Sequence, residues 1–312
     1  MCLLSFVIPC YGSEKTIEPV INEIIEVVSQ KQQYDYEIIA VNDQSPDNVL
    51  SVLKSIANTN KKLKVVDFAK NFGKHSAVMA GFSLAKGEYI VCLDDDGQCP
   101  MDRLWDLLEP VENGSADYSM ADYDVKKQSN FKNFGSAVNS FMSHTMINKP
   151  KDMHFTNFKV MKRFVVEEIL RYDNPYPYME GLTLRTTNQI ATVPMEERDR
   201  IAGVGHFTFK KSISLLMNGF TAFSVKPLRF ATVVGLICSL VGFIFGVVVV
   251  VRKLLKPAIM LGYSSTMAVM LFIGGMIMLM LGLIGEYIGR IYISLNNSPQ
   301  YVIREIINKD DD

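Results

Sequence analysis

Two long uncharged stretches near the C-terminal end constrain the fold of this chain more than any other feature. Residues 230–251 and 257–285 contain no Asp, Glu, Lys or Arg. A helix needs about 20 apolar residues to cross the roughly 30 Å hydrocarbon core of a bilayer. Helices in the core of a soluble protein are rarely so long and so uniformly apolar. The sequence therefore predicts a transmembrane hairpin, with helices at residues 230–251 and 264–288.

The rest of the 312-residue chain divides around this hairpin. Residues 1–206 are expected to form one folded domain, and residues 289–312 a C-terminal tail. Residues 207–229 carry a Lys pair within an apolar pattern, which predicts an amphipathic helix in the membrane interface or, alternatively, an ordinary surface helix. The distribution of Lys and Arg favours a cytoplasmic domain. We expect a multi-pass protein of the inner (plasma) membrane.

Composition excludes several other classes of protein. The net charge of −1 gives no electrostatic footprint for nucleic acid. The five cysteines show no CxxC spacing and no disulfide framework, which fits a reducing compartment. The N-terminal sequence has no basic region and no cleavage site, so no signal peptide is expected.

The first 120 residues alternate between β-rich runs and helical patterns. Expected strands are Leu3–Ile8, Tyr36–Val41, Leu63–Phe68 and Glu88–Leu93, and expected helices are Thr16–Ser29, Asp47–Ala57 and Lys74–Ala85. This alternation predicts an α/β fold with a mostly parallel sheet and helices on both faces. Further along, helices are expected at Ser129–Met146 and Lys162–Tyr172, a strand at Gln189–Pro194 and a loop at Arg198–His206.

Three polar or turn-forming segments follow the expected strands: Pro9 to Tyr11, Asn42 to Ser45, and Asp94 to Asp96. Open α/β sheets bind ligands at the carboxyl ends of their strands. No GxGxxG or GxxxxGK[ST] motif follows any of these strands, which argues against dinucleotide-binding and P-loop proteins. Three adjacent carboxylates repel one another unless a cation lies among them. Oxygen ligands suit Mg²⁺ or Mn²⁺, and we expect Asp94 and Asp96 to hold it.

Four segments resemble, in order and spacing, glycosyltransferase family 2: VIPCYGSEKTI, VNDQSPD, NFGKHSAVMAGFSLAKGEYIVCLDDDGQCP and RIAGVGHFTFKK. The resemblance is greatest to its polyprenyl-phosphate glycosyltransferases. It implies a GT-A type domain that transfers a sugar, with inversion, from a nucleotide sugar such as a UDP-hexose. The implied acceptor is a polyprenyl phosphate such as undecaprenyl phosphate, for assembly or modification of cell-envelope glycans.

The resemblance also implies roles for individual residues. Pro9 and Tyr11 would line the nucleotide base, and Asp43 would receive the base or ribose. Asp94 and Asp96, followed by Gln98, would hold the metal ion and the donor diphosphate. Lys132, Ser136 and Arg200 would bind the acceptor phosphate. Asp94, Asp96 and Arg200 would be the catalytic residues, whereas Asp95 stands where the family usually has a small residue.

The chain departs from the family pattern at the segment Thr156-Asn157-Phe158-Lys159, where the family has G-D-F-R with a proposed catalytic Asp. Asp152 and His154 are nearby but do not align with it. A base is dispensable if the acceptor is a lipid phosphate, because this group is already ionised near pH 7. The Tyr11-Gly12-Ser13-Glu14 segment replaces Y-N-E-E, and Gly205-His206 replaces a Ser-Lys pair.

The residues are also compatible with other functions. The domain could be a non-catalytic membrane scaffold, a processive polysaccharide synthase, or a phosphohydrolase with Asp94 as nucleophile. Only one Trp is present and no Q-x-x-R-W motif, which argues against the synthase, and Gln98 stands where the hydrolase motif needs Thr. GxxxG motifs at Gly242–Gly246 and Gly285–Gly289 predict close helix packing and a homo-oligomer.

Overall fold

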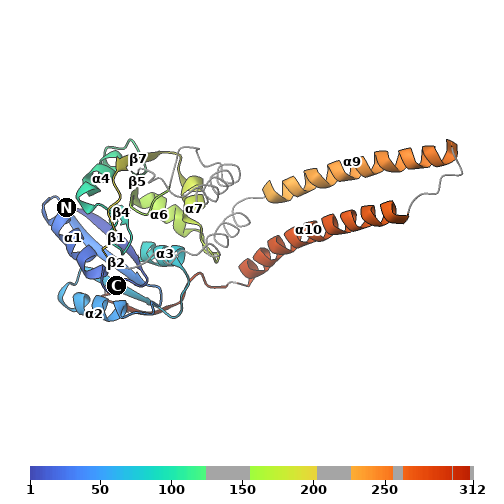
Figure 1. Ribbon diagram of the computed structural model, residues 1–312. Coiled ribbons are helices and arrows are strands. Elements are labelled where there is room, and N and C mark those ends of the chain that lie inside the picture. Colours follow the sequence, from blue (N-terminus) through green and yellow to red (C-terminus); the bar gives the residue numbers. More distant parts are fainter. Residues whose placement is uncertain (124–154, 202–225, 256–262, 297, 310–312) are drawn as a thin grey trace. The chain divides into compact units, whose positions relative to one another are not determined.

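The computed structural model describes residues 1–123, 155–201, 226–255, 263–296 and 298–309 (Figure 1). It divides into two compact units. The first contains residues 1–212 together with residues 297–312, and the second contains residues 213–296. The chain therefore leaves the first unit before the two long helices and returns to it after them.

One mixed sheet runs through the described part of the first unit, with the strand order β7-β5-β6-β4-β1-β2-β3-β8. The strands are β1 (Cys2–Cys10), β2 (Tyr34–Asn42), β3 (Leu63–Phe68), β4 (Tyr89–Cys92), β5 (Tyr118–Tyr123), β6 (Lys159–Lys162), β7 (Ile190–Met195) and β8 (Ile303–Ile307). Strand β1 is parallel to β2 and β4, and β2 is parallel to β3. Strand β6 is antiparallel to β4 and β5, and β8 is antiparallel to β3.

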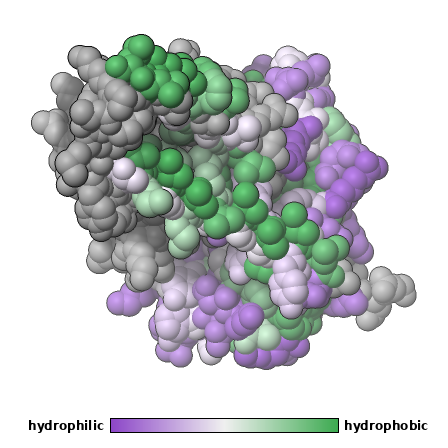
Figure 2. Space-filling model, turned by 90° about the vertical axis from the view of Figure 1, so that its right-hand side faces the viewer, coloured by the Kyte–Doolittle hydropathy of each residue, from purple (hydrophilic) through white to green (hydrophobic). Residues whose placement is uncertain are grey.

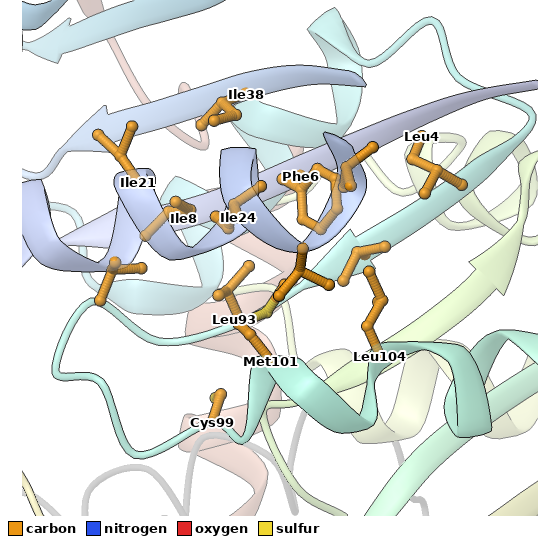
Figure 3. Packing of buried hydrophobic residues seen from close by; sticks show 14 of the residues in the cluster. Leu4, Phe6, Ile8, Ile21, Ile24, Ile38, Leu93, Cys99, Met101 and Leu104 are labelled. Atoms are coloured by element: carbon orange, nitrogen blue, oxygen red, sulfur yellow. The ribbon is translucent and has the colours of Figure 1, made fainter. Parts of the chain in front are cut away.

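Helices cover both faces of this sheet (Figure 1). They are α1 (Ile17–Ser29), α2 (Val49–Thr59), α3 (Lys74–Leu84), α4 (Leu104–Glu112), α6 (Arg163–Leu170) and α7 (Met179–Thr186). Side chains of a strand alternate between the two faces. Leu4, Phe6 and Ile8 of β1 therefore join the cluster formed with α1 and α4 (Figure 3), and the intervening Val7 lies against Gly81 of α3.

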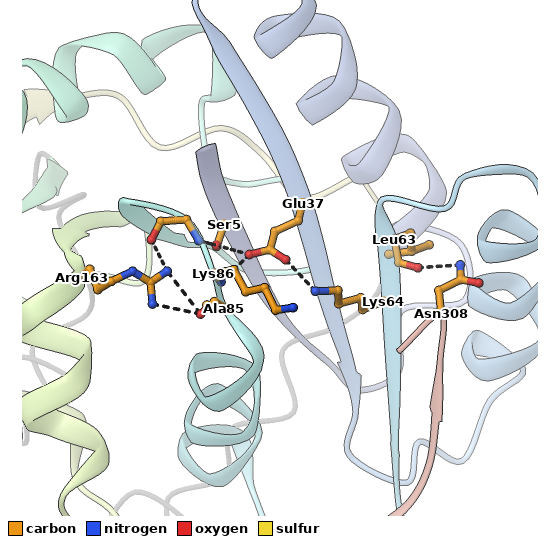
Figure 4. Close-up of polar contacts among 9 residues, drawn as sticks. Ser5, Glu37, Leu63, Lys64, Ala85, Lys86, Arg163 and Asn308 are labelled. Carbon is orange, nitrogen blue, oxygen red and sulfur yellow. Dashed lines mark hydrogen bonds and ion pairs between the residues drawn. The ribbon is translucent and has the colours of Figure 1, made fainter. Parts of the chain in front are cut away.

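A buried carboxylate fixes the middle strands to the C-terminal end of α3 (Figure 4). Glu37 of β2 accepts hydrogen bonds from the Ser5 hydroxyl and the Lys86 backbone N–H, both at 2.5 Å, and pairs with Lys64 Nζ at 2.8 Å. A buried charge is tolerated only with such partners. The three contacts connect β1, β2 and β3 with the segment that leads into β4.

The structure confirms the seven strands and helices expected in the first 120 residues, with ends that differ by a few residues. The later helix at Lys162–Tyr172 corresponds to α6, and the later strand at Gln189–Pro194 corresponds to β7. The helix expected at Ser129–Met146 and most of the 207–229 segment lie outside the described residues. Sequence reasoning missed α4, α7, β5, β6 and β8, the last of which lies within the expected C-terminal tail.

The second unit contains α9 (Lys226–Leu255) and α10 (Tyr263–Leu295). Both are long and apolar enough to cross a membrane, with candidate spans at Ala231–Val248 and Phe272–Leu295. Large apolar side chains of both helices are exposed. Hydrophobic residues, coloured green, cover broad areas of the face shown in Figure 2. A Cβ added at any glycine of the two GxxxG motifs would meet no atom within 4 Å. Association of copies through these glycines stays a prediction.

Candidate functional site

The carboxyl ends of three adjacent parallel strands converge, as the sequence predicts. In the order β4-β1-β2, Val7 pairs with Cys92 and Cys10 pairs with Asn42. The segments that follow these strands therefore leave the sheet at one edge. They carry Tyr11, Asp43 and the three consecutive aspartates.

Asp94 is held by two side chains from different elements. Lys74, the first residue of α3, forms an ion pair with Oδ1, and Asn157, just before β6, donates from Nδ2 to Oδ2 at 2.8 Å. Burial lowers the pKa of Lys74, but the Asp94 carboxylate more than offsets this, so the pKa lies above its ordinary value. The ammonium group is therefore a fixed positive charge beside the aspartates.

Asp96 is joined to the predicted acceptor residue Arg200. The Arg200 Nη2 atom lies 3.3 Å from Asp96 Oδ2, and the Gln98 backbone N–H donates to Oδ1 at 3.1 Å. The Ile201 N–H also donates to the Asp96 carbonyl at 3.2 Å. Gly97 has φ +77°, and a Cβ at this position would lie 2.3 Å from Ile201 Cδ1. Glycine thus lets the aspartate loop and the Arg200 segment approach closely.

A second pair of contacts reinforces the approach of these two loops. The Arg198 backbone N–H donates to the Gln98 carbonyl at 3.1 Å, and Gln98 Nε2 donates back to the Arg198 carbonyl at 3.2 Å. The guanidinium of Arg198 turns away, to Glu23 at 2.7 Å and to Asp102. Arg198 therefore anchors the segment, while Arg200 faces the aspartates.

Asp95 has a role that the sequence reasoning did not assign. Its Oδ2 atom accepts the backbone N–H of Tyr11 at 2.9 Å, which connects the loops that follow β4 and β1. Burial raises the pKa of the Asp95 carboxyl to about 6. Each of the three aspartates thus contacts a different set of residues.

Asp43 supports the start of α3. Its two carboxylate oxygens accept the backbone N–H groups of Phe72 at 2.7 Å and Gly73 at 2.9 Å. The residue is only 3% exposed, and burial raises the pKa of its carboxyl to about 6. The contacts place the N-terminus of α3, and hence Lys74, beside the aspartate loop. Direct contact of Asp43 with a base or ribose stays a prediction.

The remaining predicted residues divide into three cases. Pro9 lies within β1, where it pairs with Val41 and is buried, whereas Tyr11 is 40% exposed at the edge of the site. Gln98 connects the two loops described above. Lys132, Ser136, Asp152 and His154 lie outside the described residues.

Lys74 and Asn157 are the two contact residues that sequence reasoning missed. Lys74 lies inside the NFGKHSAVMAG motif, and Asn157 occupies the position where the family pattern has Asp. The sequence therefore placed both residues at positions of the family motifs. Only the tertiary structure shows that both side chains bind Asp94.

Comparison with known proteins shows which family the chain belongs to. Residues 5–170 match Glycosyl transferase family 2, which covers more than half of the chain, and residues 226–291 match the GtrB C-terminal hairpin. The chain belongs to glycosyl transferase family 2. A curated relative, the SfII prophage-derived bactoprenol glucosyl transferase of Shigella flexneri, is 30% identical over 303 residues. The alignment covers 97% of each chain, so it includes both the glycosyl transferase domain and the hairpin.

Solved structures agree on the GT-A fold. The chain resembles mannosyl-3-phosphoglycerate synthase from Rubrobacter xylanophilus with a TM-score of 0.51 at 16% identity, covering 70% of this chain and 71% of that one. Glucosyl-3-phosphoglycerate synthase from Mycobacterium tuberculosis, solved with Mn²⁺ and UDP-glucose, has a TM-score of 0.50 at 17% identity and covers 69% and 76%. At these identities the similarity establishes the fold alone. The prediction of a GT-A domain followed by two apolar C-terminal helices is confirmed.

Proposed function

We propose that this glycosyl transferase moves a hexose from a UDP-sugar to a polyprenyl phosphate at the inner membrane. The observation that carries the proposal is the pairing of Asp96 with Arg200. It brings a predicted donor residue and a predicted acceptor residue together at the carboxyl ends of the strands. The full-length similarity to a bactoprenol glucosyl transferase, hairpin included, supports a lipid acceptor of the same class. The choice of UDP and of a hexose follows from the family resemblance.

The aspartates fit a divalent cation that the substrate helps to coordinate. Mg²⁺ commonly binds one or two carboxylates, substrate phosphates and water, and does not need a cage made only of protein ligands. Asp94 and Asp96 supply two such carboxylates, and the described residues contain no cluster of three or more potential ligands. We assign Mg²⁺ or Mn²⁺ to these two residues. When bound, the ion would neutralise negative charge on the leaving diphosphate.

The cationic side chains suit a reaction between two anions. Lys74 lies beside Asp94 and Arg200 beside Asp96, so each carboxylate has a positive neighbour. Asp96 occupies one part of the Arg200 guanidinium, which has five N–H donors in all. The side chain is 43% exposed, so the other donors are able to bind the acceptor phosphate together with Lys132 and Ser136.

Chemistry at this site does not require a protein base. Asn157, which replaces the Asp of the family pattern, donates a hydrogen bond to Asp94 and has no basic side chain at neutral pH. An acceptor phosphate oxygen is already ionised, so it attacks the anomeric carbon without losing a proton. Positioning of the two reactants and stabilisation of the leaving diphosphate then supply the rate enhancement.

The path of the chain supports a two-span arrangement. Residues on both sides of the hairpin belong to the first unit, which fits one crossing by α9 and one by α10. We assign the first unit to the cytoplasmic side, where nucleotide sugars and the phosphate end of the lipid meet. We also propose that copies of the chain associate through the GxxxG motifs.

Turnover of the full-length protein in detergent tests the proposal. Candidate UDP- and GDP-sugars are incubated with undecaprenyl phosphate and Mg²⁺ or Mn²⁺, and the lipid product is identified by its mass. Arg200→Ala is expected to lower kcat/KM for the lipid roughly tenfold to over a hundredfold at saturating donor, because a charge-assisted hydrogen bond is worth about 1.5–3 kcal/mol.

Arg171→Ala is the matched control, because Arg171 is 78% exposed on the side chain and pairs only with the neighbouring Glu168 among the described contacts. This variant should behave like the wild type. Absence of a lipid-linked sugar with every donor would contradict the proposed reaction. An unchanged kcat/KM for the lipid in Arg200→Ala would remove Arg200 from the acceptor site.

A further inference from the structure

The chain beyond the second long helix returns to the sheet as its edge strand. β8 pairs with β3, and the ring of Tyr301 stacks on Phe68 with 5.4 Å between ring centroids. Lys54 of α2 pairs with Glu305 at 2.6 Å. Asn308 Nδ2 donates to the Leu63 carbonyl at 2.9 Å (Figure 4). Residues 301–308, which we call the C-terminal clasp, are therefore attached to β3 along its length.

One contact of the clasp reaches a buried charge. Asp67 of β3 is only 2% exposed, and Arg304 Nη1 of the clasp lies 3.1 Å from its Oδ2 atom. The same guanidinium donates from Nη2 to the Ala69 carbonyl at 3.1 Å. Asp67 Oδ1 accepts a hydrogen bond from Asn42 Nδ2 at 2.7 Å. Asp67 thus lies between an arginine at the edge of the sheet and an amide in its interior.

Asn42 is the last residue of β2 and continues the connection toward the candidate site. Its Oδ1 atom accepts the Ser45 backbone N–H at 3.1 Å. The Ser45 hydroxyl accepts the Gly12 N–H at 2.7 Å and donates to Asp47 at 2.5 Å. Gly12 directly follows Tyr11, so the hydrogen bonds extend from the clasp to the loop after β1.

The loop between Asn42 and Ser45 has a backbone that needs support. Gln44 has φ +48°, a left-handed conformation that residues other than glycine seldom adopt. Such backbone persists only where surrounding contacts over-determine it. The Asn42 amide supplies one of these contacts, and it is oriented by Asp67. A fixed amide orientation therefore preserves the loop geometry.

We infer that Arg304 is a positioning residue for the donor side of the active site, acting through Asp67, Asn42 and Ser45 on the loops after β1 and β2. The guanidinium holds the Asp67 carboxylate, which in turn orients the Asn42 amide. The donor side is then complete only when the chain beyond the two long helices has joined β3. The inference rests on the proposed function in one respect, namely that these loops bind the nucleotide.

Hydrogen exchange tests the connection without any ligand. The full-length protein in detergent is compared with Arg304→Met, Arg304→Lys and Lys54→Met by mass spectrometry of peptides that cover residues 11–16 and 42–48. Arg304→Met should speed exchange in both peptides, and Arg304→Lys should restore most of the protection because it keeps a cation near Asp67. Lys54→Met removes a different ion pair, the one with Glu305 of β8, and should leave the exchange rates of both peptides unchanged.

Nucleotide binding tests the functional consequence. UDP and GDP, each with Mn²⁺, are titrated into the same proteins, and binding is measured by calorimetry. Arg304→Met should weaken binding of the preferred nucleotide by more than twofold and up to about thirtyfold, the scale of coupling through a contact network. Lys54→Met should bind within about twofold of the wild type.

The outcomes distinguish a failure of the proposed function from a failure of the inference about Arg304. Faster exchange in Arg304→Met with no nucleotide binding by the wild type would contradict the proposed function and with it the role of Arg304 at the donor side. Normal exchange and normal binding in Arg304→Met would overturn the inference alone. Equal effects of Arg304→Met and Lys54→Met would also overturn it, because they would show a general loosening of the clasp.

Discussion

At the scale of single residues, the three consecutive aspartates differ in what they contact. Asp94 and Asp96 have cationic partners, Lys74 and Arg200, whereas Asp95 accepts a backbone N–H of Tyr11. An asparagine at position 95 would still offer a carbonyl oxygen to that N–H. The outer two positions, by contrast, need negative charge to hold a cation. The structure therefore gives a physical reason for unequal effects of the three substitutions.

Asp94→Asn and Asp96→Asn should each lower turnover by roughly 10²–10³, the scale expected when a group that stabilises developing charge is lost. Asp95→Asn should retain measurable turnover. EDTA should abolish the wild-type reaction, and excess Mg²⁺ or Mn²⁺ should restore it. Product formation is measured at saturating donor and lipid. Near-normal rates in all three variants with EDTA present would contradict the metal assignment.

Asp43 should make stability depend on pH. Burial raises its pKa from 3.8 to about 6. Between roughly pH 4 and pH 6, Asp43 is therefore more often protonated in the native protein than in the unfolded chain. Protonated Asp43 therefore stabilises the native state. This stabilisation is fully present below the pKa of Asp43 in the unfolded chain and is lost as the pH rises through its pKa in the folded protein. The loss amounts to about 3 kcal/mol at most, at about 1.4 kcal/mol per pKa unit.

Asp43→Asn tests this dependence in full-length protein. Asparagine does not titrate, so the stability of the variant relative to the wild type should increase as the pH rises from about 4 to 7. Its amide group would face the Phe72 or Gly73 N–H, which lowers stability at every pH and leaves the trend intact. Thermal midpoints across this range provide the measurement, and a constant difference between the two proteins would refute the assignment.

At the scale of elements, close packing of α3 on β1 depends on a missing side chain. A Cβ at Gly81 would lie 2.3 Å from Val7 Cγ1. Contacts this short require the core to shift, although alanine is favoured over glycine in a helix by roughly 1 kcal/mol. The position of α3 matters for the site because this helix begins with Lys74.

Gly81→Ala should lower the free energy of unfolding by roughly 1–3 kcal/mol, the usual cost of overpacking a core. Val7→Ala removes the methyl group that the new Cβ would strike, so the double variant should be more stable than the sum of the two single effects predicts. A coupling of about 0.5–3 kcal/mol is expected for residues in contact. Additive effects in a chemical denaturation series would show that the two residues do not meet.

At the scale of the whole molecule, the two long helices form an insertion in the first unit. The chain passes through α9 and α10 and then contributes β8 to the sheet beside β3. The proposed two-span hairpin predicts that residues close to the connection between the helices and residues of the first unit are accessible from opposite sides of the membrane. The basic residues Arg252 and Lys253 belong to the last turn of α9, just before that connection, so the charge bias for orientation is weak.

Labelling with a membrane-impermeant maleimide in intact cells tests this arrangement. Lys253→Cys, near the turn, should react without permeabilisation. Lys15→Cys, an exposed position in the first unit, should react only after permeabilisation. The wild-type protein gives the background from its own cysteines. Equal accessibility of both positions in intact cells would contradict a two-span hairpin with a cytoplasmic first unit.

The sequence alone determined those features that depend on local composition. Short runs rich in strand-forming residues, alternating with helical patterns, predicted β1 to β4. Helical spacing predicted α1 to α3, and the uncharged stretches predicted α9 and α10. The ordered motifs predicted the family, and the chain order of the strands predicted that Tyr11, Asp43 and the aspartates meet at one edge.

The tertiary structure decided what depends on contacts between distant segments. Lys74 and Asn157 are 83 residues apart in the chain, yet both bind Asp94. β8, with the sequence IREII, has three β-branched residues that favour a strand, but its partner is 238 residues away in the chain, and it pairs because β3 offers an open edge of hydrogen-bonding groups. The link from Arg304 through Asp67 to Asn42 arises from that pairing. Spacing along the chain carries no signal for such contacts, because only the folded sheet brings the three side chains together.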